Sequence, residues 1–276
     1  MDKNHIAFLK RRFPRLFYKV AGSITLARIV TEFDRFNYFK CLLFKKPYFG
    51  TVMLAGQTWE SRKPHMRSLI EAEIFRKGPQ NGFHVLEMGT WAGDSAILWA
   101  DTLKRSNVIG GIVFCVDSWE ALESGKETAG VNKASLVMKD AARRGKIFKL
   151  FLHNVKTSGH ENVIKPLRGL THDILPGLKL QSFDFVYVDA SHLYSHVRHD
   201  LKWALALVRP GGVICGDDLE LQKHEIDIGY AEQNKEKDTV ICPSKGTEYH
   251  PGVTLAVDEI FGNEVTCQKG FWHVRR

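Results

Sequence analysis

From residue 83 onward, short apolar runs alternate with longer amphipathic segments. The runs predict strands at residues 83–88, 111–117, 163–170, 183–189 and 212–216. The segments between and after them predict helices at residues 94–104, 132–155 (with a break near Gly145), 193–208 and 252–261. Because the runs are continuously apolar, we expect the strands to be buried on both faces. Strands that alternate with helices indicate an α/β fold with a mostly parallel sheet and helices on both faces.

The excess positive charge of the chain lies before this pattern begins. Residues 1–50 contain 11 Lys/Arg, 3 Asp/Glu and 11 of the 30 aromatic residues, whereas the other 226 residues contain 28 charges of each sign. We therefore predict a basic, aromatic-rich helical arm or lid over residues 1–60, interrupted near Pro14 and Pro47. A single domain over residues 61–276 follows, beginning with a helix at 61–77.

Two interpretations of this arm remain open. It could be a lid or a dimer arm packed on the core, since long basic side chains often cover apolar surface. It could also contact a membrane surface or an acidic partner. The aromatic residues are mixed with Leu and Ile rather than arranged as a stacking platform, so we expect no nucleic-acid partner.

The five cysteines are scattered and form no C-x-x-C pair. This distribution predicts neither a disulfide framework nor a structural zinc site, and it favours the reducing cytoplasm. No apolar run approaches the roughly 18 residues expected of a membrane-spanning helix.

The first strand ends in a glycine-containing turn, Glu87-Met88-Gly89-Thr90-Trp91-Ala92-Gly93. Its G-x-x-x-G spacing and its Trp91 differ from the G-x-G-x-x-G turn that binds a dinucleotide pyrophosphate. The carboxylate of Glu87 would repel a phosphate but would suit a cation. S-adenosylmethionine (SAM) has no phosphate and carries an ammonium and a sulfonium. The candidate cofactor residues are Glu87, Gly89, Thr90, Gly93 and Ser95, and the alternative is an ordinary strand–helix turn.

The second strand ends at Asp117-Ser118. An acidic side chain at this place can accept hydrogen bonds from both ribose hydroxyls, although a strand-end Asp is also a common helix N-cap. Glu87 and Asp117 on successive strands together favour SAM more strongly than either does alone.

Three further carboxylates follow the two later strands. Asp189 ends the strand at 183–189, and Asp217-Asp218 follow the strand at 212–216. If these strands are neighbours, the carboxylates would repel one another unless a cation lay between them. Oxygen ligands favour Mg²⁺ or another hard divalent ion, which could acidify a substrate hydroxyl. The alternative is helix capping by these residues. His192 is a residue at a helix start, a cleft base or a metal neighbour.

These motifs, with Val116-Asp117-Ser118-Trp119, Val188-Asp189-Ala190-Ser191-His192 and residues 209–218, resemble class I methyltransferases of the macrocin O-methyltransferase type. That group includes sugar O-methyltransferases and is similar to cephalosporin-hydroxylase-like proteins. The resemblance runs from about residue 60 to the C-terminus. It implies a Rossmann-like seven-stranded sheet with a reversed last strand. It also implies SAM bound by Glu87, Gly89 and Asp117, Mg²⁺ bound by Asp189, Asp217 and Asp218, and Asp189 as base.

We therefore expect a SAM- and Mg²⁺-dependent O-methyltransferase acting on a hydroxyl of a sugar or glycosylated natural product. We further expect Asp189 and Ser118 to contact the cofactor, His192 to assist catalysis, and the chain to form a homo-oligomer. The arm and residues 220–250, of which 222–246 are polar and loop-like in sequence, would shape the acceptor pocket. The alternatives are a metal-independent small-molecule methyltransferase and a non-catalytic SAM-fold accessory protein. An NAD-linked oxidoreductase is disfavoured by Glu87 and Trp91.

Overall fold

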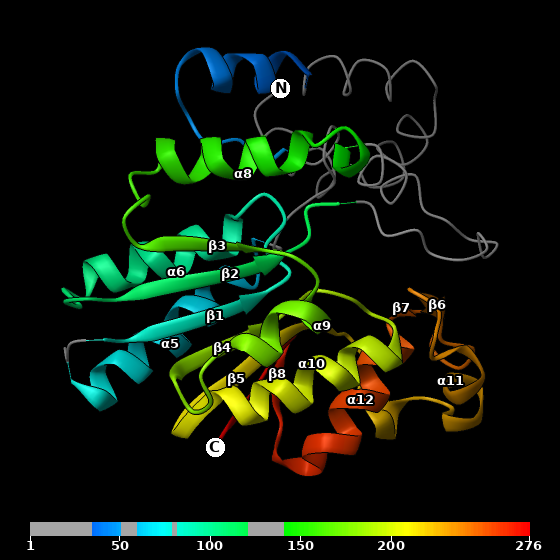
Figure 1. Cartoon of the computed structure of the whole chain (residues 1–276). Coiled ribbons are helices and arrows are strands. Elements are labelled where there is room, and N and C mark those ends of the chain that lie inside the picture. Colours follow the sequence, from blue (N-terminus) through cyan, green and yellow to red (C-terminus); the bar gives the residue numbers. More distant parts are fainter. Residues whose placement is uncertain (1–34, 51–59, 79–81, 121–140) are drawn as a thin grey trace.

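The computed structural model describes residues 35–50, 60–78, 82–120 and 141–276, and its core is a seven-stranded sheet (Figure 1). The strand order is β3-β2-β1-β4-β5-β9-β8. The strands are β1 (His84–Met88), β2 (Ile112–Asp117), β3 (Ile164–Arg168), β4 (Phe183–Val188), β5 (Val208–Leu219), β8 (Thr266–Gln268) and β9 (Gly270–Arg275). Strands β1 to β5 pair in parallel, and β9 runs antiparallel to β5 and β8. The predicted parallel sheet with a reversed last strand is confirmed.

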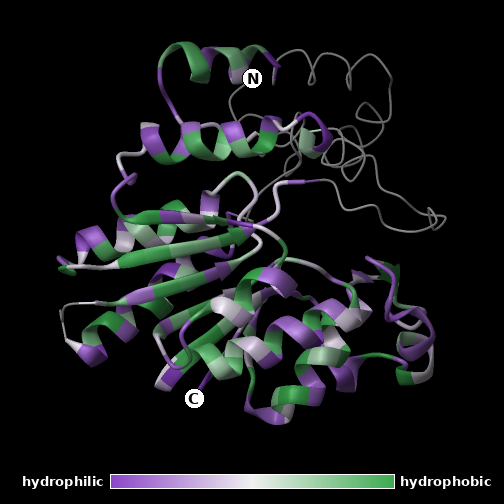
Figure 2. Ribbon diagram, viewed as in Figure 1, coloured by the Kyte–Doolittle hydropathy of each residue, from purple (hydrophilic) through white to green (hydrophobic). Residues whose placement is uncertain are grey.

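Helices cover both faces of this sheet. One face packs against α5 (Lys63–Lys77), α6 (Asp94–Arg105) and α8 (Lys146–Thr157), whose apolar residues share a core with Val85, Val113 and Phe185. The other face packs against α10 (Tyr194–Leu207) and α12 (Pro251–Phe261), with Leu86, Val186 and Ile214. Successive residues of the central strands thus enter opposite cores, which is why β1, β2 and β4 are mostly apolar (Figure 2).

Smaller elements lie around this frame. They are α9 (Thr171–Ile174), α11 (Ile228–Asn234), the two-stranded sheet of β6 (Val240–Ile241) and β7 (Glu248–Tyr249), and the 3₁₀ turns Leu175–Gly177, Lys223–Glu225 and Gly262–Glu264. The polar segment at 222–246, which we predicted to be loop-like, therefore contains a helix and a strand. Asp227 caps α11 by accepting a hydrogen bond from the backbone N–H of Tyr230 at 2.9 Å.

Two predicted boundaries differ from the structure. Strand β5 begins at Val208, directly after α10, whereas the sequence placed its start at Gly212. The predicted helix at 132–155 is described only from residue 141, and α8 begins after Gly145, the predicted break, which has a left-handed φ of +61°. Within the described ranges, no helix has the length and apolar character needed to cross a bilayer.

The described part of the arm is a helix at residues 35–43 followed by a segment that lies along α8; residues 1–34 and 51–59 are outside the described ranges. Asn154 of α8, which is buried, holds this segment. It accepts a hydrogen bond from the backbone N–H of Tyr48 and donates to the carbonyls of Tyr48 and Ala92, each at 2.9 Å. One side chain thereby joins the arm, α8 and the turn after β1.

We predict that Asn154→Ala lowers the free energy of unfolding by about 2–4 kcal/mol, because three buried backbone groups lose their partner. Urea unfolding followed by circular dichroism measures this change. Asn162→Ala is the matched control at an exposed turn, where we expect a change within about 0.5 kcal/mol. Equal effects of the two substitutions would contradict this role for Asn154.

Candidate functional site

The register of the parallel strands gathers acidic residues at one edge of the sheet. Cys115, Glu87, Tyr187 and Cys215 pair across four neighbouring strands. Two residues further along the strands, the same row continues as Asp117, Gly89, Asp189 and Asp217. These residues therefore lie at the carboxyl ends of the strands, where ligands bind in open α/β sheets.

Glu87 is fully buried beneath the turn that follows β1. Ser95 of α6 donates a hydrogen bond to Glu87 Oε1 at 2.9 Å, while Glu87 Oε2 has no hydrogen-bond partner among the described residues. Burial raises the pKa of Glu87 to about 8, against the opposing effects of Ser95, Trp99 and Thr90. A buried carboxyl with an unpartnered oxygen is suited to interact with a cation that enters the edge of the sheet.

Gly89 stands in the row between Asp117 and Asp189 and has φ of +85°. A Cβ at this position would overlap the carbonyl oxygen of Asp189, so β1 and β4 can approach closely only because residue 89 is glycine. Trp91 and Asp218 also have positive φ, which is unusual for residues with side chains. Strained backbone is common at functional sites.

Asp117 fixes the two turns on either side of it. Its Oδ2 accepts the backbone N–H of Trp91 at 2.8 Å, and its Oδ1 accepts the backbone N–H of Trp119 at 2.6 Å. Burial raises the pKa of Asp117, and these hydrogen bonds oppose that rise. Since each carboxylate oxygen has a further lone pair, Asp117 can still accept ribose hydroxyls.

A cavity of about 430 Å³ opens beside this row. Of the predicted cofactor residues, Gly89, Asp117 and Ser118 line it, whereas Glu87, Thr90, Gly93, Ser95 and Asp189 do not. Thr90 and Ser95 are buried beneath the turn, and Gly93 precedes α6 with φ of +87°. The structure thus divides the predicted residues into those that face the cavity and those that support the turn.

Sequence reasoning missed the residues that form the opposite wall of the cavity. This wall comprises Gly169, Leu170, Thr171, His172, Ala190, Ser191, Ser195, His196, His199 and Asp200. Residues 169–172 follow β3 just as Ser118 follows β2, so the shared carboxyl edge was a signal for them. The contact between His172 and His199 gave no such signal, because it arises from the packing of α9 against α10. Their ring centroids lie 5.2 Å apart.

The acidic residues at the end of β5 and directly after it surround a buried cation that the sequence did not predict. Arg62 forms ion pairs with Asp217 and, at 3.2 Å, with Asp218 Oδ1, and its Nε donates to the carbonyl of Lys269 at 2.8 Å. It also contacts Glu220 Oε1 at 3.1 Å. Burial would lower the pKa of Arg62, but the two aspartates raise it above its usual range. Arg62 is therefore a fixed positive charge in this cluster.

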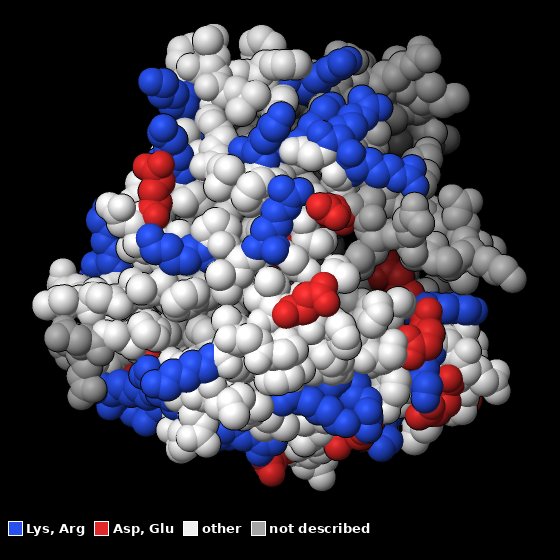
Figure 3. Space-filling view, in the orientation of Figure 1, with Lys and Arg blue, Asp and Glu red and all other residues white. Residues whose placement is uncertain are grey.

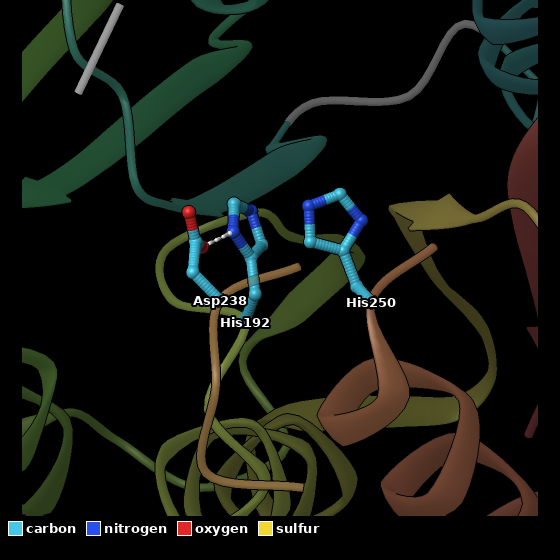
Figure 4. Close-up of side chains that lie close together, drawn as sticks. All are labelled: His192, Asp238 and His250. Atoms are coloured by element: carbon cyan, nitrogen blue, oxygen red, sulfur yellow. Dashed lines mark hydrogen bonds and ion pairs between the residues drawn. The ribbon is translucent and has the colours of Figure 1, made fainter. Parts of the chain in front are cut away.

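His192 is held between two carboxylates. Its Nε2 lies 3.0 Å from Asp218 Oδ2 and its Nδ1 lies 2.6 Å from Asp238 Oδ1. The ring of His250 lies beside it, with centroids 4.2 Å apart (Figure 4). Burial would lower the pKa of His192, but the hydrogen bonds to Asp218 and Asp238 raise it well above its usual value. The two hydrogen bonds thus favour the protonated form of His192, and its role as a base stays a prediction.

Asp189 has the opposite character. It accepts a hydrogen bond from the hydroxyl of Tyr187 at 2.9 Å. Burial and the charges of Asp218 and Asp217 raise the pKa of Asp189 well above its usual value. The backbone of Asp189 lies directly against Gly89, so this carboxyl group stands beside the turn that follows β1.

The predicted metal ligands are brought together only in part. Ligand atoms of Asp189, His192 and Asp218 lie within 4.8 Å of one another, whereas Asp217 is engaged by Arg62. Two carboxylates and an imidazole, with Asp217 next to them, are a donor set that fits a divalent cation. The mutual repulsion that raises the pKa of Asp189 would be relieved by such an ion.

Comparison with known proteins agrees with this geometry. Residues 86–219, from β1 to β5, match the family Methyltransf_24, described as a methyltransferase domain. No curated protein matches the sequence. The solved structure of the O-methyltransferase NovP is 19% identical, with a TM-score of 0.53 over 78% of this chain and 79% of that one.

Two further solved structures cover more of the chain. A Klebsiella pneumoniae protein, described provisionally as an O-methyltransferase, is 16% identical with a TM-score of 0.50 over 94% of this chain and 93% of its own. The O-methyltransferase from Bacillus cereus in complex with SAH is 16% identical, with a TM-score of 0.49 over 98% and 100%. The likeness to NovP and to the Klebsiella pneumoniae protein establishes the fold, and the matched family model is that of a methyltransferase domain.

Gly89 and Gly159 offer a matched pair for testing the close approach of β1 and β4. Both have positive φ, +85° and +72°, but a Cβ at Gly159 would have nothing within 4 Å. We predict that Gly89→Ala costs several kcal/mol of stability and abolishes SAM binding, whereas Gly159→Ala costs about 1 kcal/mol from backbone strain alone. Thermal unfolding and calorimetry with SAM measure both effects. Equal losses of stability and of SAM binding in the two variants would show that the positive φ, rather than the contact with Asp189, accounts for the effect.

Proposed function

We propose that the protein transfers the methyl group of SAM to a hydroxyl oxygen of a small molecule. The observation that supports this most directly is the row of Asp117, Gly89 and Asp189 at the carboxyl edge, beside a 430 Å³ cavity and above the buried Glu87. A cavity flanked by carboxylates suits a cofactor that carries positive charge and ribose hydroxyls but no phosphate.

In this proposal, Asp117 and Ser118 bind the ribose, and Gly89 lets the backbone approach the cofactor. Glu87 faces the α-ammonium across the turn that Thr90, Gly93 and Ser95 support. Gly169 to His172 form a further wall of the cavity and would contact the adenine.

We propose that Asp189, Asp218 and Asp217 hold Mg²⁺ or another hard divalent ion, with His192 beside them. When bound, the ion would acidify the acceptor hydroxyl. Asp189 would accept the hydroxyl proton, since its backbone lies directly against Gly89 of the cofactor turn. Arg62 keeps Asp217 and Asp218 ionised and in place. The enzyme would act chiefly by positioning the two reactants and stabilising charge.

The acceptor we propose is a sugar or a glycosylated natural product. Its support is the resemblance of the strand-end motifs to the macrocin type and the crowding of Asp238, His250 and Glu220 at the same edge. His250 Nδ1 lies 3.0 Å from Glu220 Oε2. Carboxylates and imidazoles of this kind hydrogen-bond readily to vicinal hydroxyls.

The protonation of Glu87 gives the cofactor site a testable signature. Because its pKa is about 8, Glu87 is mostly protonated in the free protein at pH 6–7.5, and SAM must displace that proton to gain the charge interaction. We predict that SAM affinity rises by close to tenfold per pH unit in this window, below the pKa of about 8 of an α-amino group. Calorimetry in buffers of different ionisation enthalpy should show that about one proton is released for each SAM molecule that binds.

Glu87→Gln is the control for this experiment. The amide cannot ionise, so the variant should bind SAM more weakly, without proton release and with little pH dependence. If wild type and Glu87→Gln show the same affinity at every pH, Glu87 does not interact with the cofactor. If neither binds SAM, the function itself is wrong.

The proposed metal site can be tested by measuring metal binding directly as well as by measuring turnover. We predict that Asp189→Asn and Asp218→Asn weaken Mn²⁺ binding, measured by electron paramagnetic resonance, at least about tenfold. Asp217→Asn should weaken it less, because Arg62 engages that carboxylate, and all three variants should still bind SAM. Turnover with labelled SAM and a panel of sugars and glycosides should stop in excess EDTA.

Asp227→Asn is the matched control for charge removal, since Asp227 is exposed and asparagine caps a helix equally well. Full activity in EDTA, or Mn²⁺ binding that is unchanged in Asp218→Asn, would contradict the metal role. The metal-independent alternative would then be preferred, with Arg62 as the fixed cation of the cluster.

A further inference from the structure

The helix at residues 35–43 and the outer side of α8 form one basic, aromatic surface, which we call the basic surface. Figure 1 shows the two helices stacked at the end of the molecule away from α12, and Figure 3 shows Lys and Arg gathered over them. Residues 35–50 and 141–158 contain nine Lys/Arg and no Asp/Glu. These are Arg35, Lys40, Lys45, Lys46, Arg143, Arg144, Lys146, Lys149 and Lys156.

Large apolar side chains are exposed among these cations. Their exposed fractions are 67% for Phe36, 58% for Phe39, 76% for Leu43, 61% for Phe44 and, on α8, 44% for Leu152. Phe36, Phe39 and Leu43 recur at helical spacing and therefore lie on one side of the helix. Single exposed apolar residues are ordinary, but a contiguous group of them marks an interaction site.

The opposite side of the same helix is packed against the protein. Tyr38 and Cys41 contact the core that contains α8, and the ring of Tyr38 lies 5.1 Å from that of Tyr48. Tyr48 is in turn held by Asn154 of α8, and His153 Nε2 lies 2.9 Å from the carbonyl of Lys46. The helix is thus fixed to α8 with its apolar side facing outward.

We propose that the basic surface docks on an anionic lipid bilayer, with the phenylalanines in the headgroup region and the lysines and arginines on the phosphates. A helix that combines cations with exposed Phe and Leu is typical of an interfacial helix. Nucleic acid would use the cations but not the aliphatic residues Leu43 and Leu152. A second copy of this chain would bring nine cations against nine, which opposes self-association.

Vesicle co-sedimentation of the full-length protein tests this proposal. Phosphatidylcholine vesicles are compared with vesicles that also contain about 30% phosphatidylglycerol, which gives their surface a negative potential. We expect binding only to the anionic vesicles, and we expect it to weaken as salt is raised. Because the basic surface lies outside the methyl-transfer site, this result does not depend on the proposed function.

Two pairs of substitutions separate the charge from the apolar contribution. Lys40→Glu with Lys149→Glu should weaken anionic-vesicle binding by about 25-fold or more, since each basic residue near the surface contributes roughly fivefold. Phe36→Gln with Leu43→Gln should also weaken it while leaving the salt dependence in place. The control, Lys179→Glu with Lys202→Glu, makes the same charge change at exposed sites elsewhere and should alter binding by less than about twofold.

Circular dichroism and calorimetry with SAM show whether each variant is folded. Binding to both kinds of vesicle alike, or to neither, would overturn the proposal. Light scattering that shows a dimer broken by Phe36→Gln with Leu43→Gln, without vesicle binding, would assign the surface to self-association instead. Equal losses in the Lys40/Lys149 and Lys179/Lys202 variants would show that net charge, rather than this surface, is responsible.

Discussion

The buried guanidinium of Arg62 joins parts of the chain that lie more than 150 residues apart, and the carboxyl edge of the sheet depends on it. Parallel register brings Asp117, Asp189 and Asp217 into one row, and Asp218 follows directly. Such a row is unfavourable unless cations balance it. Arg62 binds Asp217 and Asp218, and the glycine at 270 leaves room for it, because a Cβ there would overlap the guanidinium. The hydrogen bonds of His192 to Asp218 and Asp238 favour its protonated form, which adds to this balance.

The distribution of acidic and basic groups divides the carboxyl edge of the sheet into two sides with different charge properties. On the β1–β2 side, Glu87 and Asp117 have raised pKa values and no cationic partner among the described residues. Both carboxyl groups can therefore interact with a positively charged cofactor. On the β4–β5 side, Asp218 has a lowered pKa, because His192 and Arg62 outweigh its burial. Asp189 lies between the two halves, and its pKa is raised by burial and by the charges of Asp218 and Asp217.

The sequence predicted the strand-end residues because parallel strands share an edge and apolar runs reveal where strands end. It did so for Glu87, Asp117, Asp189, Asp217 and Asp218. It could not predict Arg62, which is an unremarkable residue before a helix and meets its partners only through long-range packing. Asp238 and His250 were missed for the same reason, since the polar segment around them has no periodic pattern. The early start of β5 was missed because Pro210-Gly211-Gly212 suggests a turn, yet Val208 already pairs with Phe183.

A crystal structure with S-adenosylhomocysteine bound tests the central claim most directly. The account predicts the ribose hydroxyls on Asp117, the adenine between Gly169–His172 and the start of α10, and the amino group beside the turn above Glu87. The sulfur would then point toward Asp189 and the Arg62 cluster. Cofactor found elsewhere, or a ligand that fills the cavity without contacting Asp117, would contradict it.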